Sequence, residues 1–213
     1  MKTNNQFLQL YTKYYIEREY EQTDLFRMLR QTYTISRVIY PGSYLHIAPS
    51  FVFPDVVYID AGTRAQRAFD LDTVHAYICQ RKEYHDVPHI AFYGRDYRQL
   101  IPTLVQSCDL LISQYAGFVS DVCKPYLKPG GWLLVNNSHA DAGLAAIDPA
   151  YQLVATVHKR QGHYRLSQHT LDQYFIPKRA LHITKEWLYQ RGKGIGYTKT
   201  APLYLFQRRM EVS

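Results

Sequence analysis

The sequence predicts an α/β domain with buried parallel strands. Short apolar runs alternate along its 213 residues with longer amphipathic segments, and polar residues follow several of the runs. Residues 108–141 are the clearest case, because their pattern predicts strand, helix, turn and strand. The polar end of this stretch carries Asn136, Asn137, Ser138, His139 and Asp141. Ligands bind beyond the carboxyl ends of the strands in open α/β sheets, so we expect a site there.

The first half of the chain predicts three strands and their connecting helices. Residues 1–34 carry two apolar stripes at helical spacing, which predict two amphipathic helices. Residues 37–40, 55–60 and 89–93 are apolar runs that predict strands. Two prolines in residues 46–54 predict only a turn or two of helix after the first strand. Residues 63–84 predict one helix or a pair.

The second half predicts four more strands. Residues 109–113 and 132–135 flank a predicted helical face made by Phe118, Val122, Tyr126 and Leu127. The sequence Lys128-Pro129-Gly130-Gly131 is expected to end that helix. Residues 142–150 predict a turn and a short helix. Residues 151–157 predict a strand that residues 158–160 end, and a turn at 161–164 leads into another extended piece. Residues 181–191 predict a helix and residues 202–206 a final strand.

The run CDLLISQYAG…LKPGGWLLVNN resembles strand 4, helix D and strand 5 of the class I S-adenosylmethionine (SAM)-dependent methyltransferases. The segment LKPGGWLLV carries most of the likeness, which extends over residues 37–135. The resemblance implies one Rossmann-like domain over residues 1–213, with SAM as cofactor and residues 1–34 as a helical extension. It also implies a seven-stranded, mostly parallel sheet with helices on both faces. The last strand would be antiparallel and form a hairpin with the one before.

The first cofactor motif of this family is degenerate here. The family usually has an acidic residue followed by a G-x-G loop, whereas this chain has Tyr40, Pro41, Gly42 and Ser43. The resemblance implies that these four residues approach the methionine part of SAM through a Pro-Gly turn. The missing acid and second glycine leave open the alternative that the chain is a binding module without catalysis.

Two carboxylates match cofactor positions of the family. Asp60 ends the second predicted strand, 18 residues after Gly42, where a carboxylate accepts hydrogen bonds from both ribose hydroxyls. The alternative is an ordinary strand-end aspartate. Asp96 matches the residue that bonds the adenine amino group, and Tyr97 could lie against the ring. Asp96 is also a good cap for a helix predicted over residues 97–105.

The acceptor side is expected after the fourth and fifth strands. Ser113 would lie beside the methyl group as a cofactor residue, and Gln114, Tyr115 and Asn137 would contact the substrate. His139 is the best-placed base and Tyr115 a second catalytic candidate, while a surface-loop histidine is the competing interpretation. DNA amino-methyltransferases typically carry Asn/Asp-Pro-Pro-Tyr/Phe after strand 4, and this chain does not.

The remaining motifs argue against other chemistries. The sequence Gly192-Lys193-Gly194-Ile195-Gly196 follows a helical segment and lacks the phosphate-loop spacing, so it predicts a flexible loop near the substrate side. The nine histidines show no metal-ligand spacing, and we predict no metal site. The charge of +7 attracts anions, yet the basic residues are dispersed and indicate a solvated surface.

These patterns predict a cytoplasmic protein. The sequence has no apolar run of about 20 residues, no signal peptide at its start, and three widely spaced cysteines. We therefore expect a SAM-dependent methyltransferase with an unidentified, small-molecule acceptor and no membrane partner. A catalytically inactive methyltransferase-like module and a nucleic-acid methyltransferase are the alternatives. The sequence leaves the oligomeric state open.

Overall fold

The computed structural model describes residues 5–210. The chain forms two compact units, residues 1–99 and residues 100–213. None of the described helices is long and apolar enough to cross a membrane. Our prediction of a single domain over residues 1–213 stays a prediction.

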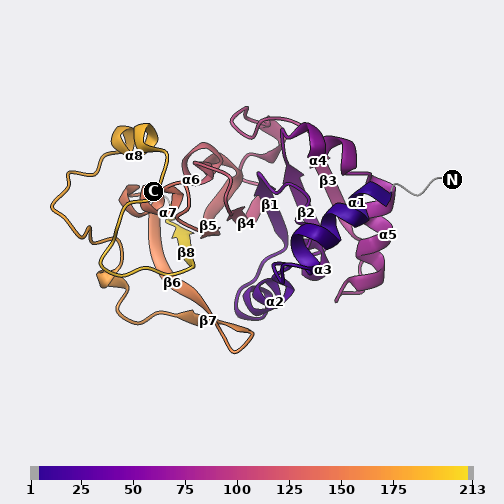
Figure 1. Ribbon diagram of the computed structural model, residues 1–213, viewed down its shortest axis with the longest axis horizontal. Helices are drawn as coiled ribbons and strands as arrows, with labels where there is room; N and C mark the ends of the chain where they lie inside the picture. The colour runs from indigo at the N-terminus through magenta and orange to yellow at the C-terminus, as the bar shows by residue number, and fades with distance from the viewer. Residues whose placement is uncertain (1–4, 211–213) are drawn as a thin grey trace. The chain divides into compact units, whose positions relative to one another are not determined.

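Three parallel strands form the sheet of the first unit (Figure 1). They are β1 (Arg37–Pro41), β2 (Asp55–Ile59) and β3 (His89–Tyr93), with β2 in the middle. The strands are in register from their first residues, so that Arg37, Asp55 and His89 lie side by side. The Asp55 carboxylate lies 3.1 Å from Nδ1 of His89 and 3.5 Å from Nε of Arg37. The three carboxyl ends therefore also lie together.

The helices of the first unit are short. They are α1 (Asn5–Tyr11), the π-helical η1 (Thr12–Ile16), α2 (Thr23–Thr32), α3 (Pro49–Val52), α4 (Thr63–Ala68) and α5 (Leu71–Arg81). Aromatic contacts join α1, α3 and α5, because the Phe51 ring packs edge-on against both Tyr11 and Tyr77. The N-terminal helices and the abbreviated helix after β1 are as predicted, except that residues 1–4 lie outside the described part.

His46 is a buried polar residue in the core of the first unit. Its Nε2 lies 2.7 Å from the carbonyl oxygen of Glu21, which can only accept, so Nε2 carries the proton. Its Nδ1 therefore accepts from the hydroxyl of Tyr40 at 3.2 Å, and its ring stacks on that of Tyr15. Burial lowers the pKa of His46 to about 4, and the hydrogen bond to Glu21 opposes this shift. The neutral imidazole is thus part of the folded structure.

We predict that protonation of His46 destabilises the fold in acid. The unfolded chain binds this proton more tightly, so stability is lost as the pH falls from about 6.5 to about 4. The His46→Gln variant has no titrating group there. We expect the wild type to lose about 3 kcal/mol relative to the variant between pH 7 and pH 4, measured by urea unfolding. Parallel pH profiles of the two proteins would contradict this assignment.

Five strands form the sheet of the second unit. They are β4 (Cys108–Ser113), β5 (Leu127–Val135), β6 (Tyr151–Arg160), β7 (His163–Ser167) and β8 (Leu203–Arg208). The strands β4 and β5 are parallel. The last strand, β8, is antiparallel to both β5 and β6, and β6 forms an antiparallel hairpin with β7. The order within this unit is thus β4-β5-β8-β6-β7.

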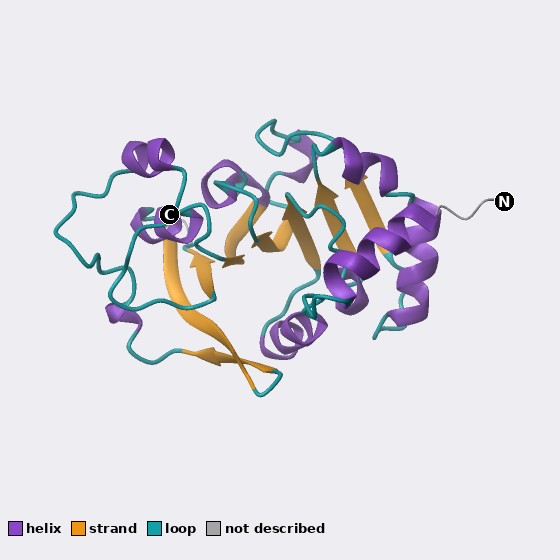
Figure 2. Cartoon of the chain, viewed as in Figure 1, coloured by secondary structure: helices purple, strands orange, loops and turns teal. Residues whose placement is uncertain are grey.

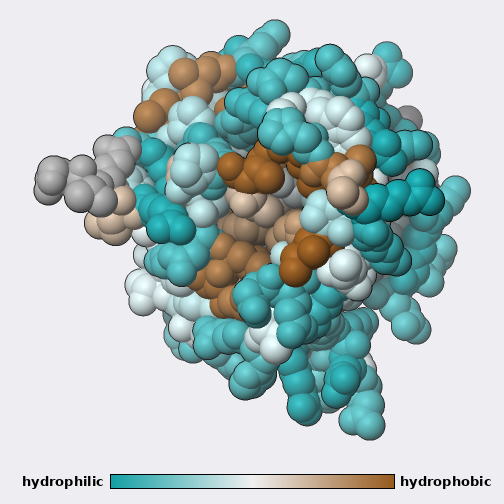
Figure 3. Space-filling view, turned by 90° about the vertical axis from the view of Figure 1, so that its left-hand side faces the viewer, coloured by the Kyte–Doolittle hydropathy of each residue, from teal (hydrophilic) through white to brown (hydrophobic). Residues whose placement is uncertain are grey.

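Long irregular segments connect these strands (Figure 2). Their helical parts are η2 (Pro102–Leu104), α6 (Val119–Val122), η3 (Lys124–Tyr126), α7 (Asp141–Ile147), η4 (Leu171–Gln173) and α8 (Lys185–Arg191). Helix α8 packs on α7 through Leu188, which is buried with Ala140 and Leu144. On the face of this unit that Figure 3 shows, hydrophobic side chains gather in a hollow surrounded by hydrophilic ones.

The predicted α/β class with a mostly parallel sheet is confirmed, with three corrections to the strands. Eight strands are present among residues 5–210 instead of seven, because the extended piece after the turn at 161–162 forms β7. The residues 158–160 continue β6 instead of ending it. The last strand is antiparallel and pairs with β6, as predicted, but the tight hairpin joins β6 to β7 instead.

Two predicted helices are wrong, and proline explains both. The helix over residues 97–105 is reduced to η2, because Pro102 has no N–H and the preceding Ile101 is extended. The helix between β4 and β5 is broken into α6 and η3, where Pro125 removes another donor. The residues Lys128–Gly131 therefore belong to β5 and do not end a helix.

Candidate functional site

In the first unit, Asp60 joins the loops that follow β1 and β2. Its two carboxylate oxygens accept the backbone N–H groups of Tyr44 and Gly62, each at 2.7 Å. The first loop turns back at Gly42, where φ is +64°, and at Tyr44, where φ is +51°. The N–H of Gly42 donates to the carbonyl of Ile59 at 2.7 Å. One carboxylate thus fixes the turn at residues 42–44.

The residues around this turn divide into core and open positions. Tyr40 is 3% exposed and its hydroxyl is used by His46, so it serves the core, and Pro41 is the buried last residue of β1. Gly42 and Asp60 are half-buried. The hydroxyl of Ser43 is buried and has no hydrogen-bond partner among the described residues. Such a group is costly unless a ligand or water satisfies it.

Asp96 is held by a neighbour in its own loop. Its carboxylate accepts the backbone N–H of Arg98 at 2.9 Å and the guanidinium of the same residue at 2.5 Å. These bonds lower the pKa of Asp96. No helix begins at Asp96, so the predicted cap is wrong. Tyr97 is half-buried beside it. The pairing with Arg98 means that an adenine amino group would have to share this carboxylate.

In the second unit, Asp141 forms a buried network at the ends of β4 and β5. Its carboxylate accepts the hydroxyl of Ser113 at 2.5 Å and that of Ser120 at 2.6 Å. The backbone N–H of Ser120 adds a third donor at 3.0 Å. Burial raises the pKa of Asp141 to about 6, and the serine hydrogen bonds oppose that shift. The hydroxyl of Ser113, predicted to face the cofactor, is thus committed to Asp141.

We predict that Asp141 gives the opposite pH response to His46. The folded state binds this proton more tightly, so stability falls as the pH rises from about 4 to about 6. The Asp141→Asn variant keeps the shape without the titration. We expect the wild type to lose about 3 kcal/mol relative to this variant between pH 4 and pH 7, measured by urea unfolding. His46 and Asp141 titrate over the same pH range with opposite effects on stability. Each residue is therefore tested against its own variant. A constant difference across this range would contradict the raised pKa.

Asn136 lies at the carboxyl end of β5 and organises the loop after β4. Its Oδ1 accepts the backbone N–H groups of Tyr115 and Ser138, both at 3.4 Å, and the hydroxyl of Ser138 at 2.9 Å. Backbone N–H groups only donate, so the oxygen must face them and Nδ2 must face away. Asn136 is 6% exposed, and its Nδ2 has no partner in residues 5–210. Asn136 stands at the strand end where the sequence predicts a site, but the sequence pattern gives no sign of this buried donor.

Tyr115 has a strained and open position. Its φ is +59°, which a bulky residue rarely adopts, and its side chain is 62% exposed. Backbone strain of this kind is frequent at functional sites. The neighbouring Gln114 is buried, whereas His139 is exposed in the turn after β5. The structure thus separates the predicted acceptor residues into exposed and buried groups.

Asn137 is covered by the loop Gly192–Gly196. Its Oδ1 accepts the N–H of Gly143 in α7 at 2.9 Å. A Cβ atom at Gly194 would lie 2.5 Å from the carbonyl oxygen of Asn137 and 2.9 Å from its Nδ2. The glycine loop therefore packs closely on the residues after β5 at Gly194, and its predicted flexibility stays a prediction.

We predict that Gly194→Ala destabilises the second unit and that Gly196→Ala does not. Neither glycine is in the left-handed region, and a Cβ at Gly196 would meet Lys178 Cδ at an ordinary 3.7 Å. The methyl group added at residue 194 would force the backbone at Asn137 to move, which should lower the free energy of unfolding by about 1–3 kcal/mol. The control should stay within about 0.5 kcal/mol of the wild type in urea unfolding. Equal stability of the two variants would show that the close contact with Asn137 is absent.

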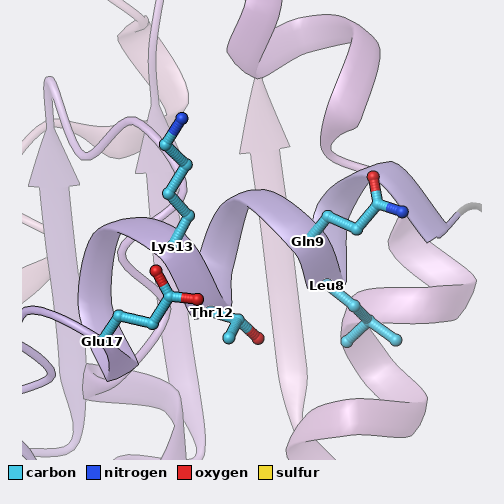
Figure 4. A pocket seen from close by; sticks show the side chains of 5 residues that line it. All are labelled: Leu8, Gln9, Thr12, Lys13 and Glu17. Atoms are coloured by element: carbon cyan, nitrogen blue, oxygen red, sulfur yellow. The ribbon is translucent and has the colours of Figure 1, made fainter.

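The surface of α1 and η1 carries a separate hollow of about 470 Å³ (Figure 4). It is lined by Leu8, Gln9, Thr12, Lys13 and Glu17, whose side chains project from one stretch of the N-terminal helix. None of the predicted site residues lines it. We do not assign it a role in the candidate site.

Solved structures of other proteins are similar in fold to this chain. No family model and no curated protein matches the sequence. A crystal structure of a Corynebacterium glutamicum protein aligns over 90% of this chain and 82% of its own, with 11% identity and a TM-score of 0.51. A SAM-dependent methyltransferase from Methanosarcina mazei aligns over 86% and 98%, with 13% identity and a TM-score of 0.45. The O-methyltransferase TomG from Streptomyces achromogenes, in complex with SAM, aligns over 68% and 76%, with 15% identity and a TM-score of 0.46.

Proposed function

We propose that this chain is a SAM-dependent methyltransferase that acts on a small molecule. The observation that carries the proposal is the Asp60 carboxylate at the end of β2. Each of its oxygens holds one backbone N–H, and a carboxylate has about four acceptor positions in all. Capacity for two ribose hydroxyls therefore remains. The resemblance of residues 37–135 to the methyltransferases assigns the same role to this residue.

The turn at Gly42 is compatible with the methionine part of the cofactor. Gly42 and Tyr44 both have positive φ, so the backbone reverses within three residues without a second glycine. Ser43 lies between them and holds a buried hydroxyl without a partner among the described residues, which a polar ligand group would satisfy. Asp96 and Tyr97 would contact the adenine. These features favour an active cofactor site over a degenerate module.

The acceptor would be bound by residues after β4 and β5. SAM, when bound, supplies an electrophilic methyl group, and the protein's main task is to position the acceptor atom. The buried Nδ2 of Asn136 is a donor available for that purpose. Gln114 and Asn137 would add to the acceptor site. Tyr115 and His139 are the titratable side chains that could remove a proton from an acceptor that must lose one.

The cellular setting is also a proposal. The cysteines Cys79, Cys108 and Cys123 are all free thiols, which fits a reducing compartment such as the cytoplasm. A nucleic-acid acceptor is not favoured, since the basic residues are dispersed along the sequence.

We predict that Asp60→Ala weakens SAM binding by about 10- to 100-fold, because hydrogen bonds to a charged group are lost. Calorimetric titration of SAM and S-adenosylhomocysteine measures this. The matched control is Asp55→Ala at the opposite end of the same strand, which should bind within about twofold of the wild type. Thermal unfolding by circular dichroism checks that both variants fold. Unchanged affinity in Asp60→Ala would remove the ribose assignment. No binding to the wild type at about 1 mM ligand would remove the proposed cofactor.

A further inference from the structure

A cavity of about 340 Å³ in the second unit combines positive charge with an apolar floor. It is lined by Lys178, Arg179, Leu181, Trp187, Arg191, Ile195 and Gly196. Ile195 is 8% exposed, and Trp187 packs against the buried cluster of Ala140, Leu144 and Leu188. The volume of this cavity lies in the range of pockets that bind small molecules.

The frame of this cavity is held by backbone pairing. Pro177 and Tyr197 form an isolated β-bridge, and the N–H of Lys178 donates to the carbonyl of Gly196 at 3.0 Å. Trp187 and Arg191 are one turn apart on α8, and the Arg191 guanidinium lies 5.2 Å from the Trp187 ring centroid. The cations and the indole are thus presented on paired backbone and a helix.

The three cations of this cavity have no acidic partner among the described residues. No acidic residue lines it, and Lys178, Arg179 and Arg191 form no ion pair within residues 5–210. A second cavity of this unit, about 390 Å³, makes the contrast clear. Its two lysines are each paired, Lys124 with Asp148 at 2.6 Å and Lys185 with Asp121 at 2.7 Å. Unneutralised charge beside apolar surface distinguishes the first cavity.

We propose that this cavity binds an organic anion with a flat aromatic body. The aromatic group would lie on Ile195, Leu181 and the edge of Trp187, where its apolar area leaves water. A carboxylate or phosphate head would face the three cations, and arginine pairs with both heads through two parallel hydrogen bonds. The small concave volume favours a small molecule over a nucleic-acid strand. This proposal does not depend on methyl transfer or on SAM.

The test uses naphthalene-2-carboxylate and its neutral analogue naphthalene-2-carboxamide, titrated calorimetrically into the full chain without SAM. We expect the carboxylate to bind at least tenfold more tightly than the amide, with affinity falling as salt rises. Naphthyl phosphate serves as the second arm and separates a preference for phosphate from one for carboxylate. Equal binding of acid and amide, or no binding of any anion at millimolar concentration, would overturn the proposal.

Variants locate the site. Arg191→Gln and Lys178→Gln remove exposed charges without touching the core, and each should weaken the carboxylate at least fivefold. Lys185→Gln, on the same helix but facing Asp121, is the matched control and should stay within twofold. If all three variants weaken binding equally, only general charge attraction operates and the proposal fails. A single-stranded oligonucleotide that binds through Arg191 while naphthalene-2-carboxylate does not would assign the surface to nucleic acid instead.

Discussion

A polar group withdrawn from water must find a hydrogen-bond partner, and this constraint shapes the strand ends in both units. Asp60 meets it by accepting two backbone N–H groups from two different loops. Asp141 meets it with the hydroxyls of Ser113 and Ser120. The loops that follow the strands have defined positions because these two acceptors need donors.

Two of the exceptions to this rule lie at strand ends, whereas two others, the Tyr11 hydroxyl and Gln22 Oε1, lie in the N-terminal helical segment. The Ser43 hydroxyl follows β1, and the Asn136 amide nitrogen follows β5. Both are buried without a partner in the part of the chain that the structure describes. Where most buried polar groups at a strand end are hydrogen-bonded and one is not, that one can form a hydrogen bond with a polar atom of a ligand. The same reasoning separates the two cavities of the second unit, one with matched charges and one without.

Much of the fold followed from local sequence patterns. The strands β1, β2, β3 and β4 could be predicted because their apolar runs are short and end at Gly, Asp or Ser. The helix between β4 and β5 was mispredicted because its apolar residues have helical spacing, and the helix after Asp96 because aspartate is a good cap, whereas Pro125 and Pro102 remove N–H groups that these helices need. At the candidate site, Asp60 could be selected from the sequence, because it lies at the end of a predicted strand. Asp141 and Asn136 stand at the polar strand end where a site was expected, but their hydrogen bonds could not be predicted, because their partners are distant in sequence or are backbone groups. The close approach of Gly194 to Asn137 depends on tertiary packing that no local pattern encodes.

The β-bridge between Pro177 and Tyr197 makes residues 178–196 a closed loop that carries α8. The entropy of closing such a loop rises only slowly with its length, by about 0.6 kcal/mol for each doubling. The exposed residues 179–182 can therefore be lengthened at little thermodynamic expense while the bridge stays closed. The length of residues 179–182 can therefore vary between proteins of the same fold. Such variation leaves the strands that carry the candidate site undisturbed.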